Sequence, residues 1–509
     1  MHRPNQGRTR TRIAAASMVI ALLAASCADD SDPPDASATT EPTRETGAET
    51  TTSPPTSVEP AGDYDEFGGL RALAFEATGR FRVEQGDDGR WWLITPDGHA
   101  FWSHGLQGVT STGTPEGDSV FPYETNILER HGSKEAWADN TLQLMDRAGF
   151  NTIGDFSEIE FFEGDLPYVT GVFLNHHAPR VERGPDAFRG RAADFFHPDF
   201  EAGVLTDMET VRQCGADPHC IGVFLDDEIS WAASFLMPIP YFDSYQWLEP
   251  GAPGKEALQQ FLEERYDGEI AGFNETWGTS LESFDEIQTV DPEVAPLSDA
   301  AAEAGTPAQQ SDRFAFRTAV AERFFSVAGE AFDDAGPDVL NLCPRALPGN
   351  LTADVIDVAA RSCDVISINA FDVPQVALDF IGQYAWTGAI QPDPLFSDVP
   401  EIATIADRPI LLSSFSYRAE VEGLNDFPPT FIFEILPTQQ DRADRYEQYM
   451  IGALAEPTVI GAHWFIHSDQ PAAGRWDGEN SNFGIVDITD EPYEVLVDRM
   501  TAVASGIYE

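Results

Sequence analysis

The sequence predicts an α/β fold, specifically a (β/α)8 barrel, and three observations carry this prediction. Eight short apolar runs alternate with helical patterns along the chain. Polar clusters bound the runs, which is typical of strands buried on both faces of a parallel sheet. One run, Ile221–Leu225, ends in Asp226, Asp227 and Glu228. Barrel enzymes carry catalytic groups at the C-terminal ends of strands. The alternative is a strand that runs into an acidic, solvated loop.

The amino-acid composition limits the kinds of partner that the protein can bind. The chain has 509 residues and a formal net charge of -56, from 30 Lys+Arg against 86 Asp+Glu. Such a surface repels nucleic acid and anionic membranes, so neither is expected as a direct partner. The hydrophobic content of 42% is ample for a large core, and a barrel with insertions can use most of this length.

The N-terminus has the features of a targeting segment. Four arginines precede an apolar run, Ile13–Ala25, that is short for a membrane span. The run closes with LAASC, ending at Cys27, and resembles a bacterial lipoprotein signal, although Ala24 replaces the usual Leu. We therefore expect lipidation of Cys27 and an extracytoplasmic protein that contacts the membrane only through this anchor. Ordinary secretion, with Cys27 incidental or removed, is the alternative.

Three segments follow from this pattern. Residues 1–26 are the expected signal peptide and residues 64–509 the expected barrel. Between them, residues 27–63 consist of Thr, Ser, Pro, Glu and Asp with almost no large apolar side chains. Such a composition cannot bury a core, and it predicts a disordered tether.

The expected elements come in this order. FRVEQ and RWWLITP flank GDDG and predict an N-terminal β-hairpin over Phe81–Pro96. The barrel strands are expected at Ala100–Val109, Phe150–Phe156, Tyr168–Asn175, Ile221–Leu225, Val339–Cys343, Asp364–Asn369, Pro409–Phe415 and Val459–Ile466. Helices are expected at Lys134–Ala148, Phe200–Gln213, Arg313–Ala335 and Arg442–Ala455, with a helical insertion at Lys255–Ile287 after the fourth strand. No phosphate-binding glycine loop occurs, and no cofactor is expected.

The cysteines allow one disulfide prediction. Cys214 and Cys220 are close in sequence and would lie outside the cytoplasm, so we expect a bridge before the acidic strand. Cys343 ends one apolar run and Cys363 begins another. In a parallel barrel these positions are opposite rims, and we expect no bridge between them.

Several stretches carry a family resemblance. GRWWLITPDGHAFWSHGLQGV, GFNTIGDFS, IGVFLDDEISW, RPILLSSFSYRA and GAHWFIHSDQPAAGRWDGENSNFGIVDITDEPY resemble the β-agarase-type glycoside hydrolases of clan A, in consistent order from Gly79 to Tyr493. The resemblance implies a barrel, a polysaccharide substrate and retaining hydrolysis. It places Glu228 as the general acid/base. Asp227, which precedes it where relatives carry Asn, is a candidate for substrate binding.

Strand seven departs from the family pattern. The chain reads Ser413-Ser414-Phe415-Ser416 where relatives have a nucleophilic Glu at the second position. Retaining hydrolysis needs two carboxyl groups about 5–5.5 Å apart. A serine hydroxyl is a poor nucleophile without a base and carries no charge for an oxocarbenium-like centre. Ser414 therefore puts the usual double displacement in doubt.

Other acids near strand ends are candidates for a second carboxylate, but the pattern favours a solvated loop acid or a sugar hydrogen-bonder for each of them. They are Asp155, Asp372, Asp469, Glu420 and Glu422.

Further residues are candidates for sugar binding. The resemblance places Trp464 as the aromatic floor of a sugar subsite, with a packed barrel Trp as the alternative, and the preceding His463 is also a candidate for substrate binding. Trp102, His104, Asp155 and His176 are expected at the same mouth, with plain packing as the alternative for each. Glu479 and Asn480 either reach the mouth or cap their loop. The adjacent His176 and His177 lack a nearby carboxylate in sequence, so no metal site is predicted.

The sequence therefore predicts a polysaccharide-acting glycoside hydrolase that uses Glu228 with an altered second residue. A catalytically inactive sugar-binding protein is the second hypothesis. A purely structural envelope protein would not need the aromatic and histidine placements.

Overall fold

The computed structural model describes residues 63–508 except 118, 183–191, 232–240, 291–304, 373, 375–377, 380–387, 389, 391–397 and 431. The predicted signal peptide, Cys27 and the tether lie outside the described residues. Within the described part, no helix combines the length and apolar character that crossing a membrane requires.

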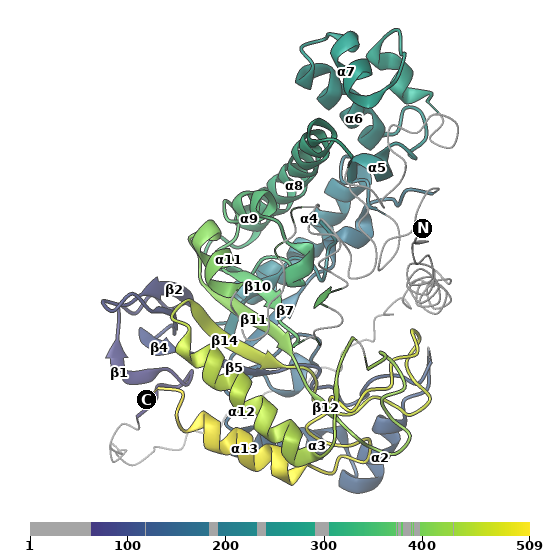
Figure 1. The fold of residues 1–509 in the computed structure, drawn as a ribbon. Helices are drawn as coiled ribbons and strands as arrows, with labels where there is room; N and C mark the ends of the chain where they lie inside the picture. Colours follow the sequence, from purple (N-terminus) through teal and green to yellow (C-terminus); the bar gives the residue numbers. More distant parts are fainter. Residues whose placement is uncertain are drawn as a thin grey trace, which may run out of the picture. The chain divides into compact units, whose positions relative to one another are not determined.

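An eight-stranded parallel sheet forms the centre of the fold and confirms the predicted barrel. Figure 1 shows several of its strands side by side with helices around them. In sheet order the strands are β10 (Ile366–Asn369), β11 (Ile410–Phe415), β14 (Val459–Trp464), β5 (Ser103–Leu106), β6 (Thr152–Ile153), β7 (Tyr168–Gly171), β8 (Cys220–Phe224) and β9 (Leu340–Asn341). Each of the eight predicted runs coincides with one of these strands, although β8 begins one residue before its run.

The barrel closes between β9 and β10 through a short irregular contact. The Ala346 N–H donates to the Ser367 carbonyl at 3.0 Å, and the Asn369 N–H donates to the Ala346 carbonyl at 2.9 Å. Ala346 follows β9 as a parallel bridge partner of Ile368. The segment that follows β9 thus pairs with the C-terminal part of β10, the sixth strand of the barrel.

A four-stranded antiparallel sheet precedes the barrel and contains the predicted hairpin. Its order is β1 (Leu70–Ala74), β4 (His99–Phe101), β3 (Trp91–Ile94) and β2 (Arg82–Gln85). The run Ala100–Val109 was expected to be one strand, but it divides at Trp102 between β4 and β5. Phe67, Phe81, Leu93 and Phe101 of this region pack with Ile221, Leu411 and Ile460 from the N-terminal halves of barrel strands. The sheet therefore covers the end of the barrel away from Glu228.

Helices return the chain between strands, and all the predicted ones are present. Those around the barrel are α2 (Pro122–His131), α3 (Lys134–Ala148), α4 (Pro198–Ala216), α8 (Pro307–Ala335), α9 (Ala353–Ala359), α11 (Val399–Ala406), α12 (Gln439–Ala455) and α13 (Glu494–Ala504). Ser133 caps α3, since its side chain accepts from the Ala136 N–H, and Gly149 ends the helix in a left-handed conformation with φ 75.

The helical insertion after the fourth strand is confirmed. It contains α6 (Pro253–Arg265), α7 (Ile270–Trp277) and the short η3 (Phe284–Gln288), preceded by α5 (Tyr241–Tyr245). Figure 1 shows α6 and α7 beyond one end of α8. This helix has 29 residues, or about 43 Å at 1.5 Å per residue, and α5 and α7 pack against it.

Two disulfides are present among the described residues. Cys214–Cys220, at the end of α4 and the start of β8, confirms the predicted bridge. The expectation that Cys343 and Cys363 remain unpaired is wrong, because they too are joined. The Asn341 carbonyl accepts the N–H groups of Asp364 at 2.9 Å and Val365 at 3.3 Å. Adjacent barrel strands are staggered and β9 has two residues, so the end of strand five lies beside the beginning of strand six.

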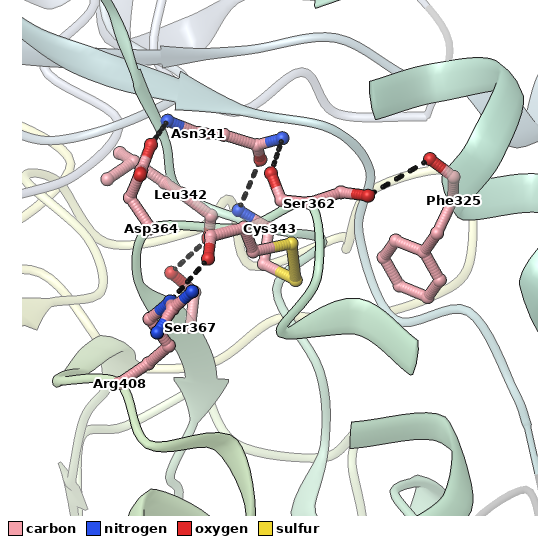
Figure 2. The surroundings of a disulfide bond; sticks show 9 residues. Phe325, Asn341, Leu342, Cys343, Ser362, Asp364, Ser367 and Arg408 are labelled. Carbon is pink, nitrogen blue, oxygen red and sulfur yellow. Dashed lines mark hydrogen bonds between the residues drawn. A yellow bond between two sulfur atoms is a disulfide. The ribbon is translucent and has the colours of Figure 1, made fainter. Parts of the chain in front are cut away.

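Hydrogen bonds hold the backbone on both sides of this second bridge. Figure 2 shows Asn341 donating through Nδ2 to the Ser362 carbonyl at 2.9 Å, while its Oδ1 accepts the Cys343 N–H at 3.0 Å. Ser367 Oγ donates to the Leu342 carbonyl at 2.6 Å. The disulfide thus reinforces the contact that closes the barrel.

Replacing Cys343 and Cys363 by Ser is expected to lower the free energy of unfolding by about 3 kcal/mol, because the bridge closes a loop with a sequence separation of 20. The matched Cys214→Ser/Cys220→Ser variant opens a separation of 6 and is expected to lose about 2 kcal/mol on the same loop-entropy argument. Urea denaturation of both variants measures the difference. A larger loss in the Cys214/Cys220 variant would contradict the expectation.

Candidate active site

Glu228 lies just past the end of β8 in an unusual backbone conformation. Its φ is 53, in the left-handed region that non-glycine residues seldom occupy and that is enriched at functional sites. The Glu228 N–H donates to the Arg345 carbonyl at 2.7 Å, which fixes the turn to the segment after β9. Asn369, at the end of β10, donates through Nδ2 to Glu228 Oε1 at 3.1 Å. The carboxylate is thus held at the C-terminal end of the barrel.

Ser414 lies at the same end. In the β10–β11 register it is the partner of Asn369, after a shift that breaks the regular alternation of β11. Ser413 Oγ donates to Asn369 Oδ1 at 3.0 Å, and Ser414 Oγ donates to Gln107 Oε1 at 3.2 Å. One Asn369 side chain therefore connects Glu228 with strand seven. The structure brings Glu228 and Ser414 together around the same mouth.

Arg345 supplies a buried positive charge to this mouth. Its side chain is 2% exposed, and Nη2 lies 3.4 Å from Asp155 Oδ2 and 3.2 Å from Asp227 Oδ1. Burial raises the pKa of Asp155, and the nearby Arg345 charge opposes that rise. Asn369 also donates to Asp227 Oδ1, at 3.1 Å. Two of the predicted sugar-binding acids, Asp155 and Asp227, are therefore drawn together by one guanidinium beside Glu228.

Sequence reasoning missed Arg345 and Asn369. Arg345 follows the run predicted as strand five, and Asn369 is the last residue of the run predicted as strand six. The one sign of a functional role in the sequence was their position at the end of a strand. The prediction considered acids, histidines and aromatic residues at such positions, and did not consider arginine or asparagine. Gln107, which accepts from Ser414, was passed over in the same way.

The expectation that His104 faces the mouth is wrong. It is fully buried on the helix side of β5, where Nδ1 lies 2.8 Å from the Gly149 carbonyl and Nε2 lies 2.8 Å from Tyr446 Oη. Trp102 is also buried and donates to the Val459 carbonyl at 3.1 Å. Alternation along the strand explains this outcome, because Ser103 and Gly105 take the inward positions.

Trp464 also packs away from the mouth, contrary to the expectation of a sugar floor. It is fully buried, donates to the Phe483 carbonyl at 3.0 Å and meets Phe415 and Tyr446 edge to face. His463 points the other way, with Nε2 2.8 Å from Ser103 Oγ. It is also fully buried, so neither side chain presents a surface to a ligand in this structure.

The remaining predicted site residues lie in different parts of the structure. His176 is exposed in η2 (Leu174–His177), and Glu479 is 8% exposed and ion-paired with Arg475 in its loop. Asp469 accepts from Asn482, Gly484 and Tyr493, and Asp372 pairs with Arg445 at 2.9 Å. Glu420 and Glu422 are exposed. Of the five alternative acids, Asp155 is the one that the structure ties to residues around Glu228.

The buried histidines predict loss of stability in acid. Burial lowers the pKa of His104 from 6.5 to about 4, although its hydrogen bond with Gly149 opposes the shift. Burial likewise lowers the pKa of His467 to about 4 and of His463 to about 3. A lowered folded-state pKa stabilises the fold above the unfolded-state pKa. That contribution is lost as pH falls through the folded-state pKa.

We expect wild type to lose free energy of unfolding between pH 7.5 and pH 5, and His104→Gln to lose about 2 kcal/mol less over that interval. The glutamine amide can still donate to Gly149 and accept from Tyr446, but it does not titrate. Urea denaturation at both pH values measures the difference. Equal losses in the two proteins would show that His104 does not contribute to the acid sensitivity.

Comparisons with known proteins agree with the geometry of the barrel. No family model matches the sequence. The chain is 27% identical over 481 residues to β-agarase A of Vibrio sp. (strain JT0107), covering 83% of this chain and 45% of that protein. It is 26% identical over 500 residues to β-agarase B of the same strain, covering 85% and 49%. The chain thus spans about half the length of the curated relatives it matches.

Solved structures share the fold. An exo-β-agarase has a TM-score of 0.70 at 24% identity, and the agarase AgWH50C has a TM-score of 0.72 at 22% identity. In both comparisons the match covers 88% of this chain and 68% of the other. The sequence matches support distant homology of this chain to the β-agarases A and B, and the solved structures show that it shares the fold of the two agarases.

Proposed function

We propose that this protein acts on a polysaccharide of the β-galactan type through the barrel mouth, with Glu228 as general acid/base. The observation that carries the proposal is the support around Glu228. A left-handed turn, the Arg345 carbonyl and the Asn369 amide all constrain one partly buried carboxylate at a strand end. A general acid must be held within hydrogen-bond reach of the glycosidic oxygen, and such support provides that constraint.

Ser414 determines how this chemistry proceeds. Its hydroxyl donates to the neutral Gln107 amide, which cannot accept a proton and so cannot activate a nucleophile. Asp155 and Asp227 share Arg345, which holds both side chains at the mouth, where they can accept sugar hydroxyls. We therefore expect slow hydrolysis or none on natural glycosides, while sugar binding is retained.

A catalytically inactive carbohydrate-binding protein is the second candidate, and the Ser414–Gln107 pair favours it. The resemblance assigns the carboxylate of retaining enzymes to the position of Ser414, and Ser414 instead donates to the uncharged Gln107 side chain. Asp155, Asp227 and Glu228 remain available to orient sugar hydroxyls in this second function. The two candidates share a ligand and differ only in turnover.

The test is a panel of agarose, other galactans and aryl glycosides, each assayed for binding by calorimetry and for hydrolysis by reducing-end release. We expect binding to agarose-derived oligosaccharides and weak or absent release. Binding confined to sugars without β-galactosyl units would overturn the substrate class. No binding and no hydrolysis across the panel would overturn the proposed function.

We also propose that the chain is a lipid-anchored extracytoplasmic protein, with residues 1–26 as signal, 27–63 as tether and 64–509 as barrel. The arginine-rich start, the apolar run and Cys27 support this proposal. The anchor would hold the barrel at the membrane surface while the tether lets it reach a polymer.

Cys27→Ala is expected to move the protein from the membrane fraction to the soluble fraction of an expressing bacterium, because a thioether-linked lipid requires the cysteine sulfur. Fractionation followed by immunoblotting measures the distribution. Cys343→Ser, which leaves the leader intact, is the control. Recovery of wild type entirely in the soluble fraction would contradict the anchor.

A further inference from the structure

Three exposed aromatic rings form a row after two adjacent barrel strands. Phe156 follows β6, and Phe173 and His176 follow β7. The ring centroids of Phe156 and Phe173 are 6.1 Å apart with an interplanar angle of 19°, and those of Phe173 and His176 are 5.6 Å apart at 14°. Phe156 is 40% exposed and Phe173 is 36% exposed. We call these three side chains the aromatic row.

The inner end of the row adjoins the candidate active site. The Arg345 guanidinium carbon lies 4.3 Å from the Phe156 ring centroid, in cation–π geometry. Arg345 also pairs with Asp155 and Asp227, and its carbonyl accepts the Glu228 N–H. The aromatic row therefore begins beside the residue that supports Glu228 and continues over the ends of β6 and β7.

The backbone conformation of Phe156 and the contacts between the rings indicate that the aromatic row is a specific arrangement. Phe156 has φ 62, a left-handed conformation that is costly for a bulky side chain and persists where surrounding contacts enforce it. Single exposed apolar residues are ordinary, but a contiguous exposed group marks a binding surface. Each ring rests on its neighbour, so little side-chain entropy remains to be lost when a ligand stacks on the row.

The surroundings select the chemistry of the ligand. A ligand on this row must be apolar on its faces and carry hydroxyl donors at its edges for the carboxylates of Asp155 and Asp227. A pyranose ring has that construction, with C–H groups directed at the negative face of an aromatic ring. The side chains of an apolar peptide would offer these carboxylates no hydrogen-bond donor in addition to those they already have. A nucleic acid would be repelled by the formal charge of -56.

We propose that Phe156 and Phe173 form the stacking platform of a sugar subsite next to Glu228, holding one uncharged pyranose unit of the polysaccharide. This proposal rests on the proposed function and gives the site an aromatic surface in place of the buried Trp464. His176 lies beside Phe173 with its ring nearly parallel to the phenylalanine ring, which helps to keep that ring in position. Asp155, at the inner end of the row, accepts hydroxyls of the stacked unit.

The test uses the full chain with Glu228→Gln, which prevents turnover during calorimetry, and an agarose-derived hexasaccharide as the probe. Adding Phe173→Ala or Phe156→Leu is expected to raise the Kd about tenfold, the effect of removing one aromatic stacking contact. Adding Phe173→Trp is expected to keep the affinity or improve it, because the stacking face is retained. Leu205→Ala on α4, where Leu205 is 59% exposed, is the control and is expected to leave the Kd unchanged.

The outcomes separate this platform from the proposed function. If the hexasaccharide binds and its Kd is unchanged by Phe173→Ala and Phe156→Leu, the platform is wrong and the proposed function stands. If Phe173→Trp weakens binding as much as Phe173→Ala, the ring acts only through local packing and the platform is again wrong. If no oligosaccharide of the panel binds Glu228→Gln, both are overturned. Circular dichroism of each variant confirms that it is folded.

Discussion

Ser414→Glu is expected to create or raise retaining hydrolysis by about 10²–10³-fold, the range for one group that stabilises charge in a transition state. The substitution restores a carboxylate at the strand-seven position that is the register partner of Asn369. Asn369 in turn contacts Glu228, so the new carboxylate enters the same mouth. Gln107, which now accepts from Ser414, can instead donate an amide N–H to it.

Proton NMR of the first-formed anomer measures both the rate and the stereochemical course of this variant. Retention is expected, because a carboxylate nucleophile inverts the centre once and water inverts it again. The Glu228→Gln/Ser414→Glu double variant is the control and is expected to lose the gain. A folded, sugar-binding Ser414→Glu protein with no gain, or one that yields the inverted anomer, would show that Ser414 does not occupy the nucleophile position.

Arg345→Met is expected to lower the free energy of unfolding by about 3–5 kcal/mol, the cost of leaving buried charges uncompensated. Methionine retains most of the packing volume but removes the charge between Asp155 and Asp227. Asp155 depends on the Arg345 charge. Burial raises the pKa of Asp155, and Arg345 is the nearby charge that lowers it. The variant is also expected to bind sugar more weakly, since Arg345 holds Phe156 and both acids.

Arg445→Met is the matched control for this substitution. Arg445 pairs with Asp372 at 2.9 Å, but its side chain is 32% exposed, and such a pair is worth about 0–1 kcal/mol. Urea denaturation of the two variants measures the contrast. Equal losses would mean that Arg345 contributes to stability through general packing, without a special role at the mouth.

The sequence predicted the barrel because its strands leave a strong signal. Strands buried on both faces become continuous apolar runs, and each of the eight runs overlaps one barrel strand. Helix α3 was predicted to the residue, since Ser133 and Gly149 mark its two ends. Glu228 became a candidate because an abrupt change from apolar to acidic residues marks the end of this strand, and the structure places that change at the end of β8.

The orientation of side chains within a run could not be predicted in the same way. In a strand buried on both faces, hydrophobicity does not alternate, so His104 and Trp464 gave no sign that they face the helices. The apolar pattern of the sequence also gives no sign of the register shift in β11. At this shift both Ser413 and Ser414 form hydrogen bonds with polar side chains. The Cys343–Cys363 bridge depends on the stagger of adjacent strands, and the aromatic row depends on loops that have no periodicity.

One measurement tests the central claim most directly: kcat and Kd of wild type and Glu228→Gln on the same oligosaccharide that wild type binds. The account predicts that Kd remains similar. It also predicts that any turnover by wild type, and any turnover gained by Ser414→Glu, falls about 10²–10⁴-fold when Glu228 is replaced. Robust wild-type hydrolysis that continues unchanged in Glu228→Gln would contradict the assignment of this mouth as the active site.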